Sequence, residues 1–311
     1  MRRIRRILVR IQNPTAPSLP AVTKAAQLAR ALDGDLTLVQ TLPTPFDPDD
    51  ELPTRHQQRG ALRNYARGAH EACFKAISLG LRRRGIRVTI SVNWDHPTDN
   101  ALLDMAGVLR ADLIVIDALP RDPADPTLSL ADWALLRHSP FPVLLVKRPA
   151  AYRRPRILLA LDPTCTSPKT RLQDAAVVSV GSALSHALHG SLHAVTAYKS
   201  RPPQSSSEAP LSAAVLAPRS THSTGRKRVD HAATGPVAHV ATDIRSALVV
   251  MGAPQEHWPG TGSCTGAPRL IQRLTCDILL VAPAPLSPRQ PAPGGLVQVD
   301  RHPQPATLVS A

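Results

Sequence analysis

Aromatic residues are scarce in this 311-residue chain, at 3%, although hydrophobic residues make up 43% of it. A folded core must therefore rest on Leu, Val, Ile and Ala. Hydrophobic runs are also short, as in residues 113–117, and none approaches the roughly 18 to 20 residues that cross a bilayer. The amino terminus lacks the longer apolar region and cleavage site of a signal peptide. These absences predict a folded cytoplasmic protein without membrane association.

The chain lacks the residue patterns of metal sites and covalent catalysis. Four scattered cysteines form no CxxC pair and have no histidine at metal-ligand spacing: Cys73, Cys165, Cys264 and Cys276. Three histidines of the second half are irregularly spaced, which favours surface or partly buried side chains over metal ligands: His231, His239 and His257. No G-x-S-x-G elbow exposes a nucleophile. The sequence predicts neither a metal site nor an enzyme.

Positive charge is abundant, with 37 Lys and Arg against 23 Asp and Glu and a formal net charge of +14. Three arginine clusters stand out: residues 2–6, 82–84 and 153–156. They are not accompanied by a helix-turn-helix, zinc-finger, RNP-like or aromatic-interleaved pattern, so sequence-specific nucleic-acid binding is not expected. A basic protein that associates with nucleic acid in a salt-dependent way stays open as an alternative.

Apolar strand patterns alternate with helical patterns along the first half. Strands are predicted at residues 7–11, 36–39, 88–92, 113–116 and 143–146, and helices at 20–32, 59–83, 100–109 and 130–137. Asp132 and Trp133 are predicted to cap and anchor the last helix. Such alternation is typical of right-handed βαβ crossovers and a doubly wound α/β fold with a parallel sheet.

The second half repeats this order, which predicts a duplicated domain. Residues 157–163, 192–195, 247–251 and 276–281 correspond to 7–14, 36–39, 112–116 and 141–146. We predict a first domain over 1–150 and a second over 151–285, with a disordered Pro/Ser/Ala-rich insert at about 201–224. Residues 286–311 form a Pro-rich tail predicted to be disordered. The closing strands 143–146 and 278–281 are apolar edges that should pair and join the halves.

Several segments resemble the universal stress protein family: ADLIVIDA (111–118), SALVVMGA (246–253), HSPFPVLLVK (138–147) and TCDILLVAP (275–283). Residues 132–137 before 139–143, and Asn93-Trp94 with Pro97, resemble its tandem E-type members. The resemblance implies two Rossmann-like domains of the adenine nucleotide alpha hydrolase type, each with a five-stranded parallel sheet. It also implies a sheet pairing between domains or subunits, a cytoplasmic location, and a role in stress survival that includes resistance to DNA damage.

Nucleotide-binding members of that family have an acid after the first strand and a later turn of the form G-x2-G-x9-G-[ST]. In the first half Gln12 replaces the acid, and Asp117-Ala118-Leu119-Pro120 stands where the turn begins. No glycine occurs between Asp112 and Pro149. Since glycine lets backbone N–H groups approach phosphates, this half is predicted not to bind nucleotide in that mode.

The second half keeps two of the features that the resemblance assigns to a nucleotide site, Asp162 and Gly252. Gln255 takes the place of the second glycine, and nearby prolines remove backbone donors. A degenerate ATP site is the candidate here, with these residues: Asp162, Gly252, Gly260, Gly262 and Gly266. No cofactor is expected, and ATP is the alternative.

These observations predict a non-enzymatic stress-response protein that acts as a binding and assembly scaffold. Its halves are expected to form an intramolecular pseudo-dimer, with homo-oligomers and an unidentified protein partner as further expectations. Three alternatives stay open: an ATP-binding switch that depends on Asp162 and Gly252, a basic nucleic-acid-associated protein, and a carrier of a hydrophobic ligand in an α/β crevice.

Overall fold

The computed structural model describes residues 4–41, 53–93, 98–118, 128–161, 168–197, 226–229, 235–253 and 267–282. The predicted insert at 201–224 and the predicted tail at 286–311 lie outside these residues. The domain boundaries and the disorder assigned to those segments therefore stay predictions. No helix in the described parts of the chain is long and apolar enough to span a membrane.

The first half contributes five strands and four helices in alternation. They are β1 (Arg6–Arg10), α1 (Pro20–Leu32), β2 (Asp35–Thr41), α2 (Pro53–Arg82), β3 (Val88–Asn93), α3 (Thr98–Val108), β4 (Leu113–Asp117), α4 (Leu130–His138) and β5 (Val143–Val146). The second half also contributes five strands. Its described elements are β6 (Arg156–Leu161), α5 (Pro168–Ala187), β7 (Ser191–Ala197), β8 (Arg226–Val229), α7 (Gly235–Asp243), β9 (Leu248–Gly252), α8 (Ala267–Arg273) and β10 (Asp277–Val281).

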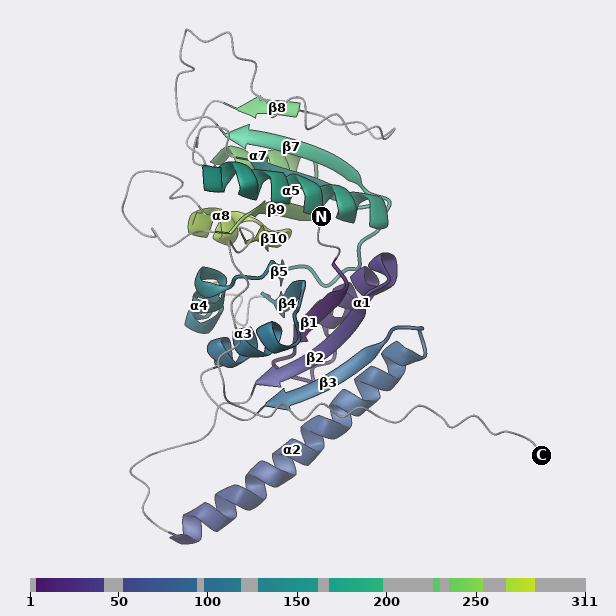
Figure 1. Ribbon diagram of the computed structural model, residues 1–311, viewed down its shortest axis with the longest axis vertical. Helices are drawn as coiled ribbons and strands as arrows, with labels where there is room; N and C mark the ends of the chain where they lie inside the picture. The colour runs from purple at the N-terminus through teal and green to yellow at the C-terminus, as the bar shows by residue number, and fades with distance from the viewer. Residues whose placement is uncertain are drawn as a thin grey trace, which may run out of the picture.

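All ten strands lie in one sheet, in the order β3-β2-β1-β4-β5-β10-β9-β6-β7-β8 (Figure 1). Every pairing within each half is parallel, as the βαβ pattern predicts. The two halves meet where β10 pairs antiparallel with β5, with Leu279 opposite Leu144. The predicted α/β class with a mostly parallel, helix-flanked sheet is confirmed, and the halves share one continuous sheet.

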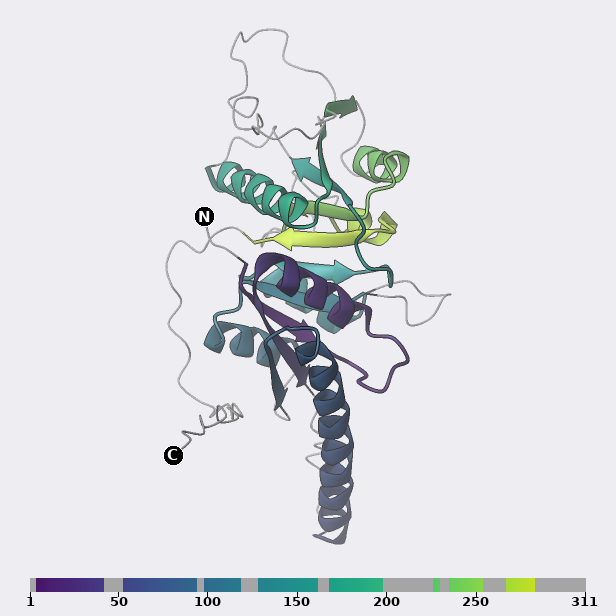
Figure 2. The same cartoon turned by 90° about the vertical axis from the view of Figure 1, so that its right-hand side faces the viewer.

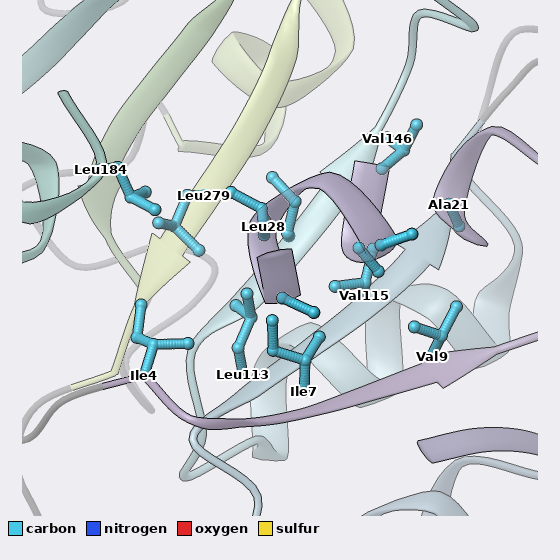
Figure 3. Packing of buried hydrophobic residues seen from close by; sticks show 14 of the residues in the cluster. Ile4, Ile7, Val9, Ala21, Leu28, Leu113, Val115, Val146, Leu184 and Leu279 are labelled. Carbon is cyan, nitrogen blue, oxygen red and sulfur yellow. The ribbon is translucent and has the colours of Figure 1, made fainter. Parts of the chain in front are cut away.

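Helices cover both faces of the sheet because successive strand residues point to opposite sides. On one face α1, α2 and α5 pack over a cluster that includes Ile7, Leu113 and Leu279. On the other face α3, α4, α7 and α8 pack over a second cluster that includes Leu8, Ile114 and Ile278. Figure 3 shows that the first cluster runs across the junction, with Leu28 of α1 near Leu279 of β10.

The observed elements agree closely with the hydrophobic pattern. Helix α1 and strand β5 have the predicted bounds. Helix α2 begins at Pro53, earlier than the predicted residue 59, with proline suited to a first helical position. Figure 2 shows this helix extending away from the sheet. The basic strand β8 was not predicted, since its sequence RKRV lacks an apolar alternation.

Candidate functional site

The strand order of the first half reverses between β1 and β4, and in open α/β sheets ligands bind in the crevice at the carboxyl ends of such strands. Gln12 follows β1 at this edge and is exposed. The backbone carbonyl oxygen of Gln12 accepts a hydrogen bond from Nε2 of Gln40 at 3.3 Å. An amide thus stands where a nucleotide-binding relative would carry an acid, as the sequence predicts.

Asp117, the last residue of β4, occupies the amino terminus of α1. Its Oδ1 accepts a hydrogen bond from the backbone N–H of Ala21 at 2.9 Å. The N-cap residue of this helix, Leu19, has no side-chain acceptor for the free N–H groups. A carboxylate from a distant strand supplies that acceptor instead. Burial raises the pKa of Asp117, and the Ala21 bond and the nearby Arg10 oppose that shift.

Asp132 lies in the first turn of α4. Ser129 is the N-cap, and the two residues form a capping box in which Ser129 Oγ accepts from the Asp132 N–H at 3.1 Å. The prediction that Asp132 is the N-cap residue is therefore wrong. Ser129 is the N-cap, and Asp132 is the third residue of the helix. Asp132 also accepts a hydrogen bond from the buried guanidinium of Arg10. Trp133 packs partly buried against the second core cluster, as predicted.

These contacts fix the electrostatics of the first crevice. Two helix amino termini face it: the carboxylate of Asp117 accepts from the Ala21 N–H of α1, and Ser129 caps α4 with Asp132 as its capping-box partner. A helix amino terminus attracts phosphate through its dipole and its unpaired N–H groups. The carboxylate of Asp117 takes up one such donor of α1 and repels a second anion.

Gly252 ends β9 in the second half and lies against the side chain of Gln173 from α5. A Cβ built on Gly252 would lie 2.6 Å from both Cδ and Nε2 of that amide, closer than van der Waals contact. Gln173 is buried and donates to the carbonyl oxygens of Ala253 at 2.9 Å and Val281 at 3.1 Å. The register of the two halves makes Gly252 the counterpart of Asp117. A side chain of the protein thus covers the corresponding strand end in both halves.

The remaining candidate residues, Asp162, Gly260, Gly262 and Gly266, lie outside the described residues. The structure therefore brings Gly252 to a defined environment and leaves the proposed glycine loop untested. Cys73 is half-buried and Cys276 is buried, and both are free thiols. In the described parts of the chain no group of three His, Cys, Asp or Glu residues could hold a metal ion. His239 is exposed, and its Nδ1 lies 3.2 Å from Oδ2 of Asp243.

A buried polar cluster at the junction of the two halves was not predicted. Lys24 of α1 donates from its Nζ to Asp277 Oδ2 at the start of β10, and both side chains are almost fully buried. The hydroxyl of Tyr152 donates to the same carboxylate oxygen at 2.6 Å, and its ring lies 4.6 Å from Lys24 Nζ. Lys24 stands on the apolar stripe of α1, which is the one sequence signal that marks it.

Backbone groups complete this cluster. The N–H groups of Lys147 and Arg148 donate to Asp277 Oδ1 at 2.9 and 3.0 Å. The segment that follows β5 is therefore tied to the first residue of β10. Burial lowers the pKa of Lys24 although Asp277 opposes the shift, and burial raises the pKa of Tyr152 well above its ordinary value. This network fixes the two halves in one relative arrangement.

Comparison with known proteins identifies the first half. Residues 3–147 match the universal stress protein family. The first half of the chain is a universal stress protein domain. None of the curated proteins compared with the chain matches it.

Solved structures extend the likeness to the fold of both halves. A protein of unknown function from Pseudomonas aeruginosa is 20% identical with a TM-score of 0.69, covering 90% of this chain and 93% of that one. A universal stress protein from Archaeoglobus fulgidus is 10% identical with a TM-score of 0.58, covering 89% and 96%. The cytoplasmic domain of a prokaryotic cation chloride cotransporter is 11% identical with a TM-score of 0.52, covering 91% and 97%. At identities this low, the likeness shows a shared fold alone.

Proposed function

We propose that this protein is a cytoplasmic, non-enzymatic stress-response protein that acts as a binding and assembly scaffold. In this proposal it supports survival of stress, including DNA damage, through a partner that its domains bind. Its membership of the universal stress protein family supports a stress-response role. The observation that carries the scaffold proposal is that a side chain of the chain itself lies at the corresponding strand end of each half, Asp117 on the Ala21 N–H and Gln173 against Gly252.

The first crevice argues against a nucleotide site on grounds of charge. Asp117 holds the α1 amino terminus and Asp132 holds that of α4. A triphosphate would have to displace a carboxylate from its backbone donor or lie beside it. In the second half Gln173 covers Gly252, so a nucleotide would have to displace an amide that makes two hydrogen bonds.

The second part of the proposal is that the halves are two copies of one domain, paired within the chain. The orders β3-β2-β1-β4-β5 and β8-β7-β6-β9-β10 are the same when corresponding strands are compared. Gly34 and Gly190 supply a detailed match, since an added Cβ would collide with the carbonyl oxygen of Arg5 in one half and of Pro155 in the other. Such agreement in close contacts supports duplication.

The polar cluster at the junction supports pairing of β5 with β10 over pairing of either strand with its own copy in a second molecule. The register places Pro142 at the position that corresponds to Asp277, and the helices place Val180 at the position of Lys24. If β5 paired with β5 of a second molecule, Lys24 would be buried against Pro142 without an acid. If β10 paired with β10, Asp277 would be buried against Val180 without a cation. Breaking a buried ion pair in this way costs about 3–5 kcal/mol.

The scaffold proposal is tested by the nucleotide content of the purified protein. After purification at moderate salt and denaturation, chromatography of the supernatant should find well below one equivalent of ATP or ADP. Titration of the native protein with ATP in a calorimeter should give no saturable heat. Stoichiometric nucleotide would overturn the proposal in favour of an ATP-binding switch, and its loss in Asp162→Ala would place the site in the second half.

The intramolecular pairing is tested by a disulfide across the junction. Leu144 and Leu279 are directly opposite, and opposed Cα atoms in antiparallel strands lie about 4.5–5.5 Å apart, within disulfide range. With the four native cysteines replaced by serine, Leu144→Cys combined with Leu279→Cys should oxidise to a cross-linked monomer on non-reducing gels. The Leu144→Cys single variant is the control. A covalent dimer from the double variant would mean that the strands pair between molecules.

A further inference from the structure

Each half presents the starting ends of its parallel strands along one edge of the sheet, which we call its amino edge. The two amino edges are built alike. Arg6 lies opposite Asp35 in the first half, and Arg156 lies opposite Ser191 in the second. The backbone N–H of Asp112 donates to the carbonyl oxygen of Arg6, as that of Ala247 does to Arg156.

The two amino edges differ in their acids. In the first half Asp112 lies 3.7 Å from Arg6, and Arg87 is ion-paired with both Asp33 and Asp35. The corresponding positions in the second half are His189, Ser191 and Ala247. Asp33 and His189 even share the same left-handed backbone, with φ of 50° and 51°. The second amino edge therefore keeps arginines at the positions of Arg6 and Arg110, namely Arg156 and Arg245, and lacks the three acids that neutralise the first.

Six exposed side chains define what we call the basic edge: Arg148, Arg153, Arg154, Arg156, His189 and Arg245. Arg148 donates to the carbonyl oxygen of Thr275, just before β10, at 3.0 Å, and Arg156 donates to that of Ile244, just before β9, at 2.9 Å. These contacts and the order of the strands place the basic side chains along neighbouring strands from β5 to β7. Four spacings of about 4.8 Å between strands give a row of roughly 19 Å.

The acids of the second half do little to neutralise this row. Its described acidic residues are Asp174, Asp243 and Asp277. Asp277 is buried in the junction cluster, and Asp243 lies in α7, with its Oδ2 3.2 Å from Nδ1 of His239 one turn before it. Asp174 lies twelve residues before His186 in α5, about 18 Å along the helix. The pKa of the neighbouring His193 is lowered by burial and then by the charge of Arg156.

We propose that the basic edge binds the phosphate backbone of double-stranded nucleic acid, independently of its sequence. A row of arginines suits phosphates, because each guanidinium presents several donors in a planar fork. Duplex binding of this kind needs only phosphate contacts. Single-strand binders add aromatic stacking platforms, and the basic edge offers none in its described residues. Membrane binding would need exposed apolar side chains, and the large ones described lie elsewhere, at Leu79, Val108 and Leu172.

The test measures fluorescence anisotropy of a labelled 25-base-pair duplex of arbitrary sequence with the full chain over a series of salt concentrations. The variant Arg153→Gln/Arg154→Gln/Arg245→Gln removes three charges from the basic edge. The matched control Arg82→Gln/Arg83→Gln/Arg84→Gln removes three exposed charges from the first half. Urea unfolding midpoints show that both variants are folded. A further variant, His189→Asp/Ser191→Asp, installs two of the acids that the first half carries.

The wild type should bind with an affinity that falls steeply with salt. Removing three phosphate contacts should weaken binding at least about 30-fold near 0.1 M salt and make the slope of log affinity against log salt shallower by about 2.7. The aspartate variant should weaken it similarly, and the control by less than about threefold. Equal losses in control and variant, tighter binding of single strands or anionic vesicles, or no duplex binding would overturn the proposal. The nucleotide assay is unaffected by any of these results, since the basic edge lies away from the crevice residues of its own half.

Discussion

Lys24 and Asp277 stand 253 positions apart in the chain, and the ammonium group of Lys24 donates to the carboxylate of Asp277 in the protein interior. Each residue belongs to a different half of the sheet. Tyr152, from the segment that joins the halves, donates to the same oxygen. A buried ion pair therefore joins the two halves where β5 meets β10.

Replacing Lys24 by methionine removes the cation and keeps much of the side-chain volume. Asp277 would remain buried with only Tyr152 and two backbone N–H groups as partners. We expect Lys24→Met to lower the free energy of unfolding by about 3–5 kcal/mol, as for other broken buried pairs. Urea denaturation followed by circular dichroism measures this loss.

Arg87 and Asp35 provide the control, because they form an ion pair that is exposed. Arg87→Met should leave the free energy of unfolding almost unchanged, since exposed pairs contribute little. Equal losses for the two variants would show that Lys24 is not buried in a specific pair.

Gly252 is required for packing rather than for a phosphate, in our interpretation. Gly252→Ala should lower the free energy of unfolding by about 1–3 kcal/mol, because its methyl group would collide with the Gln173 amide. In a Gln173→Ala background the same change should be better tolerated. The control is Gly80→Ala in α2, where an added Cβ meets nothing within 4 Å. That variant should gain roughly 0.5–1 kcal/mol. A neutral Gly252→Ala in the wild-type background would contradict the packing interpretation.

The fold was predictable from the sequence because its signals are local. Apolar runs marked β1, β4 and β5, and a stripe of small apolar residues marked α1. The repeated order of these signals predicted that the second half would resemble the first. Burial of both faces of a parallel sheet leaves few other arrangements for such a pattern.

The site was less predictable because its contacts join distant residues. Asp117 caps α1 from 96 positions away, and no spacing rule connects it with Ala21. Gln173 reaches Gly252 through the packing of α5 on the sheet. The absence of glycine between Asp112 and Pro149 did predict the loss of a phosphate turn. Which side chain would take its place depends on the three-dimensional register of helices and strands.

Asp117 should give the stability of the protein a distinctive dependence on pH. Burial raises its pKa above the ordinary 3.8, so the folded protein holds this proton more tightly than the unfolded chain does. The stability that this group contributes is present at low pH and is lost as pH rises from about 4 through the raised pKa. Asparagine has no proton to lose at this position. The stability of Asp117→Asn should therefore rise relative to that of the wild type as pH increases from about 4 through the raised pKa.

Unfolding measured between pH 4 and pH 7 tests this expectation, and Asp117→Ala separates charge from capping. The alanine variant loses the acceptor for the Ala21 N–H and should be less stable than Asp117→Asn by about 0.5–2 kcal/mol. A wild-type advantage over Asp117→Asn that grows with pH would show that the raised pKa is wrong.

Cys276 should be the less reactive of the two described thiols. Its side chain lies in the second core cluster, and burial raises its pKa to about 11. Since the thiolate is the reactive form, iodoacetamide at pH 8 should alkylate Cys276 at least about tenfold more slowly than the half-buried Cys73. Peptide mapping by mass spectrometry follows each cysteine separately. In denaturing urea the two rates should converge, because both thiols then have ordinary pKa values and free access. Rapid labelling of Cys276 in the native protein would instead mean that β10 opens readily from β5, and the junction network would then not hold the halves together.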